Sequence, residues 1–192
     1  MAAVAAIEPD TELMLRVQAG DSASFGLLLE RHRGPLIRFL YRMVQNAAVA
    51  EELAQEVFLR VYRARSSYVP SAKFTTWLFR IAMHLAHNNL RDAKGERADD
   101  SLDRETEDAP RLQVADRSPS VEQRLVENAR LLEIRRAIRA LPDKQRAAVL
   151  MHKYEELEYS QIAHVLSCSE SAVKSLLFRA YETLRGRLAH MA

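Results

Sequence analysis

The sequence predicts an all-α protein made of two small helical domains. Apolar residues recur at helical spacing along most of its 192 residues, and no segment keeps the period-two alternation of a strand. Five glycines and six prolines are few for a β-sandwich, which needs many turns. No apolar run approaches the ~20 residues of a membrane span, and the apolar start lacks the basic segment of a secretory signal. We therefore expect a cytoplasmic protein with no membrane insertion.

Four helices are expected in the first domain, residues 11–94, which follows an N-terminal tail over residues 1–10. Gly20 ends the first helix, and Asp21 caps the second. The second helix contains Gly34-Pro35, where we expect a bend or a short break. The four helices cover residues 11–19, 22–45, 48–65 and 73–94, with a loop over residues 66–72.

Residues 95–118 are expected to form a flexible acidic linker. The segment has little periodicity and carries closely spaced carboxylates, among them Asp99, Asp100, Asp103, Glu105, Glu107 and Asp108. Such a segment buries too little apolar surface to offset its chain entropy. Net basic segments, residues 1–91 and 126–192, flank it. We expect the two domains to move freely about this linker.

The second domain, residues 119–192, ends in a short helix, a tight turn and a longer helix. The turn is Ser167-Cys168-Ser169, and Ser169 or a neighbour caps the last helix. This order is that of a helix-turn-helix. Pro142 suits the first position of a helix. The expected helices cover residues 119–140, 142–156, 160–166 and about 169–188.

The last helix has one face that suits duplex DNA. Its apolar seam consists of Val173, Leu177, Ala180, Leu184 and Leu188, and the other side presents Ser171, Lys174, Ser175, Phe178 and Arg179. Lysine and arginine bond phosphates or guanine, and a phenyl ring can contact a thymine methyl. The alternative is an ordinary helical hairpin with a solvated face. However, an exposed aromatic residue beside cations is unusual on a surface that binds no partner.

The helix over residues 73–94 has a polar stripe that suits unstacked DNA. The stripe consists of Thr76, Arg80, His84, His87, Asn88 and Arg91. Cations follow the backbone of a single strand, and pockets hold flipped bases. Most of the nearby aromatic residues are expected in the core, so at most one or two would meet bases.

The helix over residues 48–65 carries acidic residues near its start and basic residues near its end. Glu51, Glu52 and Glu56 come before three arginines, an order that complements the helix dipole. The same acids also suit a protein-docking face, and the sequence leaves both interpretations open.

Four segments resemble the extracytoplasmic-function (ECF) sigma factors of bacterial RNA polymerase, in order and at matching spacing. They are residues 50–64 (AEELAQEVFLRVYRA), 74–82 (FTTWLFRIA), 141–146 (LPDKQR) and 162–180, which begins with Ile162-Ala163 and ends with AVKSLLFRA. The resemblance is to the sigma-E-like type of the sigma-70 superfamily. It covers residues 11–94 as sigma region 2 and residues 121–188 as sigma region 4, and the chain has no room for the middle domain of primary sigma factors.

The resemblance implies a role for each surface. Docking on the clamp helices of the polymerase β′ subunit would use Glu51, Glu52, Leu53, Gln55, Glu56 and Leu59. Melting and reading of the minus-ten element would use Arg60, Ala64, Tyr68, Lys73, Thr76, Trp77, Arg80, His84, His87, Asn88 and Arg91, with a flipped base near the first three. Reading of the minus-thirty-five element would use Ser171, Lys174, Ser175, Phe178 and Arg179.

Further partners follow from the same resemblance. Residues 142–157 would help to grip the β flap tip, and the linker would thread toward the active-site cleft and the RNA exit channel. An anti-sigma factor would cover the DNA-binding and docking faces. The expected state is a monomer.

Four positions depart from the family pattern. His84 stands where asparagine is frequent, and Leu176 and Tyr181 stand where many members have arginine. Ser167 replaces the usual glycine or acidic residue of the turn, and a left-handed backbone there would cost about 1 kcal/mol.

Enzymatic and metal-binding classes find little support in the sequence. Cys168 is the single cysteine, so neither an internal disulfide nor a cysteine-based zinc site is possible; its role is expected to be packing. His84 and His87 share a helix face without an evident third ligand. A glycine-rich phosphate loop and a nucleophile–base pair are also missing, so we expect no cofactor and no catalysis.

Two other functions compete with a sigma factor. A helix-turn-helix regulator that acts without polymerase would need a dimerisation or ligand domain, whereas this chain has a single-strand-like stripe and an acidic helix. A sigma mimic that only titrates a regulator would not need Lys174, Arg179 or the stripe.

Overall fold

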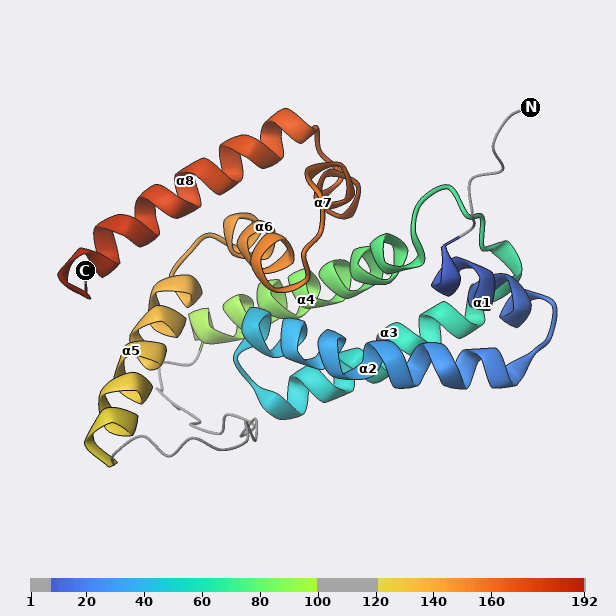
Figure 1. Ribbon diagram of the computed structural model, residues 1–192, viewed down its shortest axis with the longest axis horizontal. Helices are drawn as coiled ribbons and strands as arrows, with labels where there is room; N and C mark the ends of the chain where they lie inside the picture. Colours follow the sequence, from blue (N-terminus) through green and yellow to red (C-terminus); the bar gives the residue numbers. More distant parts are fainter. Residues whose placement is uncertain (1–7, 100–120, 192) are drawn as a thin grey trace.

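The structure, a computed structural model, describes residues 8–99 and 121–191 and is helical throughout these ranges, without a β-strand (Figure 1). The first half contains α1 (Pro9–Gln18), α2 (Ser22–Val44), α3 (Ala47–Arg63), the 3₁₀ turn η1 (Arg65–Ser67) and α4 (Phe74–Asp99). The second half contains α5 (Val121–Arg139), α6 (Asp143–Tyr154), α7 (Tyr159–Leu166), α8 (Glu170–Leu188) and η2 (Ala189–Met191). The predicted all-α class is confirmed.

The core of the first half lies between α2, α3 and α4. Phe39 of α2 is fully buried and meets Phe79 of α4 edge to face, with 5.1 Å between ring centroids. Leu36 and Leu40 are also fully buried on α2. Burial of these large side chains, at about 1.5–3 kcal/mol each, is the main force that holds the bundle.

Helix ends follow the capping residues read from the sequence. Asp21 accepts hydrogen bonds from the Ser24 hydroxyl at 2.7 Å, from Ser24 N at 3.3 Å and from Ala23 N at 3.0 Å. The bond from the Ser24 hydroxyl, followed by the two backbone bonds, lowers the pKa of the Asp21 carboxyl. Ser169 accepts one from Ala172 N at 3.1 Å and so starts α8. Both caps were predicted, and they determine where α2 and α8 begin.

Several helix boundaries differ from the expectation. Helix α1 begins at Pro9, inside the expected N-terminal tail of residues 1–10. No break occurs at Pro35: α2 continues through it, because Leu36 and other residues beyond it are fully buried, which outweighs the roughly 3 kcal/mol of an interior proline. Helix α4 continues to Asp99, so residues 95–99 of the expected linker are helical. Pro142 stands at the N-cap of α6 rather than at its first position. The remaining linker residues, 100–118, lie outside the described part of the chain.

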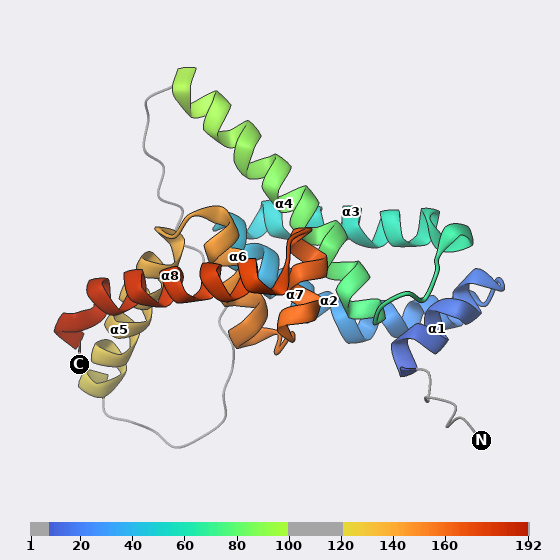
Figure 2. The ribbon, with the colours of Figure 1, turned by 90° about the horizontal axis from the view of Figure 1, so that it is seen from above.

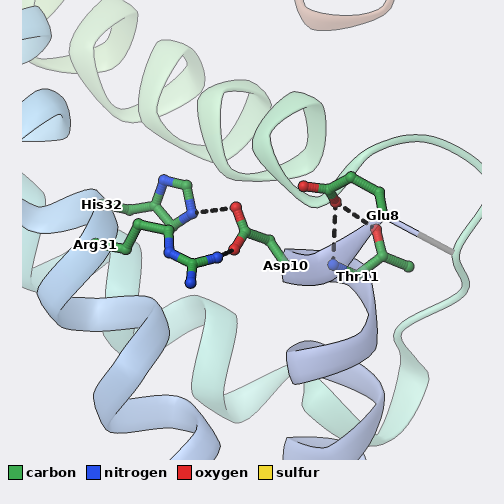
Figure 3. A network of polar contacts seen from close by, with 5 residues as sticks. All are labelled: Glu8, Asp10, Thr11, Arg31 and His32. Carbon is green, nitrogen blue, oxygen red and sulfur yellow. Dashed lines mark hydrogen bonds and ion pairs between the residues drawn. The ribbon is translucent and has the colours of Figure 1, made fainter.

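A polar network fastens α1 to α2 (Figure 3). Asp10 is buried, accepts a hydrogen bond from Arg31 and pairs with Nε2 of His32 at 2.8 Å. Glu8 caps α1 through Thr11 N at 3.0 Å. The His32 ring also packs against Phe74, 5.4 Å away. The network therefore ties the N-terminal helix to the start of α4.

The two halves of the chain pack against each other (Figures 1 and 2). Helix α7 lies on α4, and α6 lies on α2. The C-terminal part of α4 projects away from the other helices (Figure 2). Free movement of the two domains was expected from the linker, but in this structure buried side chains and hydrogen bonds join them.

Candidate nucleic-acid and protein interfaces

The predicted DNA-reading face of α8 is an exposed surface. Ser171, Lys174, Ser175, Phe178 and Arg179 line one shallow hollow near the start of the helix. Phe178 is 68% exposed, although it is a large apolar side chain. The other side of α8 is anchored, since Val173, Leu177 and Ala180 are buried. The polar face is therefore held outward by a packed seam.

The turn before α8 fixes the angle of this face. Ser167 has a left-handed backbone with φ 51°, and Cys168 N donates to Ala163 O at 3.0 Å. Cys168 is half-buried against the core, as expected for a packing role. The turn thus joins α7 and α8 without a glycine, at the small backbone cost given above.

The polar stripe of α4 is open at one end and covered at the other. Arg80, His84, His87 and Arg91 are exposed, and Asn88 is half-buried. Thr76 is only 3% exposed, because Gln161 of α7 lies on it and donates to its hydroxyl oxygen at 3.3 Å. The stripe is therefore an exposed polar surface only in its C-terminal part, where Arg91 pairs with Asp92 at 3.3 Å.

The proposed base pocket beside this stripe is partly filled by its own side chains. Tyr68 is 5% exposed and packs on Trp77, with 4.9 Å between ring centroids. Burial raises the pKa of the Tyr68 hydroxyl. Ala64 and Trp77 are half-buried, while Arg60 and Lys73 are exposed. Arg60 pairs with Glu56 at 2.6 Å. The pocket role of these residues stays a prediction.

The acidic face of α3 borders an apolar groove that the sequence did not reveal. Glu51, Glu52 and Gln55 are exposed, and Leu59 is 42% exposed; Leu53 and Glu56 are half-buried. The groove has a volume of about 520 Å³ and runs between α2 and α3, where Phe25, Leu29 and Tyr62 join Leu59. The run Leu27-Leu28-Leu29 was the available signal, because three consecutive residues cannot share one helix face.

A second groove lies between α2, α5 and α6. Its floor includes Ile37, Tyr41 and Ile134, and its cationic residues include Arg38 and Arg135. Because it is formed by both halves of the chain, no local sequence pattern could indicate it.

Residues 8–99 and 121–191 show neither a metal site nor a membrane span. These ranges hold no group of three or more histidine, cysteine or acidic side chains placed to bind a metal ion. Among the same residues, no helix is both long and apolar enough to cross a membrane.

Comparisons with known proteins agree on one family. Sigma-70 region 2 matches residues 28–96, and sigma-70 region 4 matches residues 131–184. The RNA polymerase sigma-H factor of Pseudomonas aeruginosa is 34% identical over 180 residues, which is 92% of both chains. The ECF RNA polymerase sigma-E factor of Escherichia coli K12 is 32% identical over 184 residues, or 93% of this chain and 94% of the relative.

The chain belongs to the ECF sigma factors. Its function is therefore that of an RNA polymerase-associated factor that directs transcription to promoters, and the alternative of a polymerase-independent regulator is not supported. Both sigma-70 regions are matched along one chain, as the sequence resemblance predicted.

Solved structures share the fold of this sigma factor. CnrH in complex with the cytosolic domain of CnrY superimposes with a TM-score of 0.71 at 19% identity, covering 96% of this chain and 100% of that one. The sigma factor RpoE of Bartonella quintana, in complex with the anti-sigma factor NepR, gives a TM-score of 0.69 at 20% identity, covering 86% and 96%.

Proposed function

We propose that this sigma factor divides its work among three surfaces: α8 reads the minus-thirty-five element, α4 melts and reads the minus-ten element, and α3 docks on core polymerase. This proposal assigns the functions of sigma region 2 to residues 11–94 and those of sigma region 4 to residues 119–192. The observation that carries the proposal is the outward cationic face of α8, where Lys174, Arg179 and the exposed ring of Phe178 lie together.

Helix α8 presents its N-terminal half to the major groove. Lys174 and Arg179 reach phosphates or guanine edges, and Phe178 contacts a thymine methyl. Ser175 donates to Ser171 O at 3.0 Å, so its hydroxyl oxygen remains an acceptor for a base amino group or a water. The buried seam of α8 supplies the rigidity that base reading requires.

Helix α4 guides the melted strand. The exposed cations and imidazoles of Arg80, His84, His87 and Arg91 follow its backbone. Lys73 and Arg60 are exposed near the loop, where the half-buried Trp77 supplies aromatic surface for an unstacked base and the buried Tyr68 packs behind its ring.

Docking on core polymerase combines charge with apolar burial. Glu51, Glu52 and Gln55 provide the charged and polar rim, and Leu59 borders the groove between α2 and α3. A cationic helix with an apolar side chain aimed into that groove fits this surface. The β′ clamp helices are the proposed partner, and residues 142–157 are proposed to meet the β flap. No bond is made or broken by these surfaces, so the chemistry of initiation is assigned to the polymerase.

Core binding of matched leucine variants tests the docking surface. Leu59→Arg places a charge beside the groove and is expected to weaken core binding at least 10-fold. Leu27→Arg is the control, since Leu27 is 51% exposed on α2 and does not line the groove. Equal core affinities of the two variants would refute this assignment of α3.

An anti-sigma partner is proposed for the groove between α2, α5 and α6. Both structural neighbours were solved as complexes, and one partner there is an anti-sigma factor. The apolar floor and the cations Arg38 and Arg135 fit an amphipathic acidic segment. Arg135→Glu is expected to weaken capture of this sigma factor by its anti-sigma factor while core binding remains. Unchanged capture would exclude this groove.

A further inference from the structure

Helix α1 packs against η1 and α4 and so lies beside the loop that joins them, residues 68–73 (Figure 1). The Gln18 side chain links the two: its Nε2 donates to Ser66 O at 3.1 Å and to Tyr68 O at 3.2 Å. A side-chain amide carries two N–H donors. Both are therefore used on the backbone where η1 passes into the loop, 48 and 50 positions later in the chain. Sigma-70 region 2 matches residues 28–96, so the match does not include α1.

Thr11 supports the same loop from the same face of α1. It lies seven residues before Gln18, and residues seven apart share one side of a helix. Burial raises the pKa of the Tyr68 hydroxyl, and the nearby Thr11 side chain opposes that shift. Glu8 fixes the Thr11 hydroxyl, which donates to Glu8 Oε2 at 2.9 Å (Figure 3). One face of α1 therefore supports both the ring and the backbone of Tyr68.

Helix α1 is itself firmly held, so it can serve as a fixed support. Met14 is fully buried and Val17 is only 2% exposed. The buried Asp10 carboxylate pairs with Arg31 and His32 of α2 (Figure 3). A loop that is bonded to a fixed helix has fewer accessible positions than a loop that is bonded only to itself.

The bonds within η1 shape the turn without placing it on the rest of the protein. Tyr68 N donates to Arg65 O at 3.3 Å, which is a bond inside the turn. Beyond it, Val69 is 71% exposed, and the Tyr68 ring packs on Trp77 with 4.9 Å between ring centroids. The exposed end of the loop and the Trp77 ring are thus carried next to a backbone that Gln18 holds in place.

We propose that Gln18 is a positioning residue for minus-ten recognition: it holds the backbone of residues 66–68 on α1 and so keeps Tyr68 behind the Trp77 ring that receives the unstacked base. The proposal rests on the minus-ten role proposed above for α4 and this loop, whereas the anchoring rests on the contacts alone. Without the two hydrogen bonds the loop samples more positions. Discrimination between minus-ten bases then falls, because a loosely held site fits incorrect bases nearly as well as correct ones.

Fluorescence of Trp77 tests the anchoring in the full-length protein, because Trp77 is the single tryptophan of the chain. Gln18→Glu keeps the shape of the side chain but replaces the donor with a carboxylate oxygen, which repels both carbonyl oxygens. Loosening of the loop exposes the ring, so Q18E is expected to raise the acrylamide quenching constant of Trp77 by about 2-fold.

Arg16→Gln is the matched control. Arg16 is exposed in the last turn of α1 and pairs with Glu12 of the same helix at 2.9 Å. R16Q changes the net charge by the same amount as Q18E, at the same end of the same helix, and leaves both loop bonds in place. Its Trp77 quenching should equal that of the wild type.

Selection from a promoter library tests the consequence for recognition. Core polymerase is loaded with each protein and offered promoters whose minus-ten and minus-thirty-five positions are randomised. Q18E is expected to lower the preference for the best minus-ten bases by roughly 5-fold, which corresponds to one lost hydrogen bond of ordinary net strength. Its minus-thirty-five preference should stay at the wild-type value, since α8 lies in the other half of the chain. R16Q should keep both preferences.

Each other outcome overturns a defined part of the proposal. Wild-type quenching in Q18E would overturn the anchoring. Raised quenching with an unchanged minus-ten preference would overturn the positioning role, since the loop would then be loosened without effect on base reading. An equal loss of preference at both elements would assign the effect to general misfolding and not to the loop. If no chain supports initiation, the wild type included, the proposed function fails, and quenching still decides whether Gln18 anchors the loop.

Discussion

Two phenylalanine-to-alanine substitutions are expected to have opposite effects, and their contrast tests the assignment of α8. Phe39 is fully buried between α2 and α4, whereas Phe178 is 68% exposed on α8. The same atoms are removed at both positions. Only the surroundings of the two rings differ, so any difference in stability or DNA binding between the variants reflects the role of each ring in the structure.

Phe39→Ala should destabilise the protein without acting on DNA recognition. A buried phenylalanine replaced by alanine costs about 3–5 kcal/mol, because transfer energy is lost and a cavity remains. The edge-to-face contact with Phe79 at 5.1 Å places the cost toward the upper end of that range. A domain is stable by only about 5–15 kcal/mol, so this variant should unfold at a much lower urea concentration.

Phe178→Ala should leave stability almost unchanged and weaken promoter recognition. An exposed substitution shifts the free energy of unfolding by about 0.5 kcal/mol or less. Loss of one base contact costs about 1–3 kcal/mol, or roughly 5- to 150-fold in affinity. Urea unfolding followed by circular dichroism gives the first quantity, and holoenzyme binding to promoter duplexes gives the second. If Phe178→Ala binds promoter DNA as the wild type does, or loses more than about 2 kcal/mol of stability, the reasoning is refuted.

Three further predictions follow from local geometry. Lys174→Ala and Arg179→Ala are each expected to weaken promoter binding by about 1–3 kcal/mol. If the lost contact is to a phosphate, binding should weaken equally for all DNA sequences, and its salt dependence should fall. Unchanged promoter binding of both variants would show that α8 does not contact the DNA. Ser167→Gly removes a left-handed serine with φ 51° and should raise the free energy of unfolding by at most about 1 kcal/mol, since glycine also gains entropy in the unfolded chain; a fall in the urea midpoint would contradict the turn geometry. Hydrogen bonds from the Ser24 hydroxyl and from the Ser24 and Ala23 amides lower the pKa of Asp21 below the ordinary pKa of an aspartic acid, so its stabilising contribution is present above that ordinary pKa and is lost as the pH falls through the lowered one. Asp21→Asn keeps the cap and should show a smaller loss of melting temperature between neutral and strongly acidic pH, and an equal loss in both proteins would contradict this.

Local structure could be predicted because its causes are local. The caps at Asp21 and Ser169, the turn at Ser167 and the apolar seam of α8 each depend on a few neighbouring residues. A bend or a short break was expected at Pro35, and the break was wrong because burial further along α2 outweighs the lost hydrogen bond. Periodicity indicates which residues are buried. It does not show whether the free energy gained by that burial exceeds the cost of a proline inside the helix.

Contacts between the two halves could not be predicted, because their partners are far apart in sequence. In the sequence, Arg146 looks like any surface arginine. In the structure it donates to Met43 O at 2.6 Å, and Met43 lies 103 positions earlier in the chain. Thr76 was assigned to the polar stripe of its helix, and only the position of Gln161 shows that it is covered. The groove beside Leu59 was missed for the same reason, since it needs α2 as well as α3.

Run-off transcription from a promoter library, with purified bacterial core polymerase in the presence and absence of this protein, tests the central claim most directly. We expect start sites that depend on the protein, with enriched sequences at both the minus-ten and the minus-thirty-five positions. The loss of minus-thirty-five enrichment in the Lys174→Ala, Arg179→Ala double variant would assign that element to α8. Absence of protein-dependent starts, with tight duplex binding in the absence of polymerase, would contradict the account.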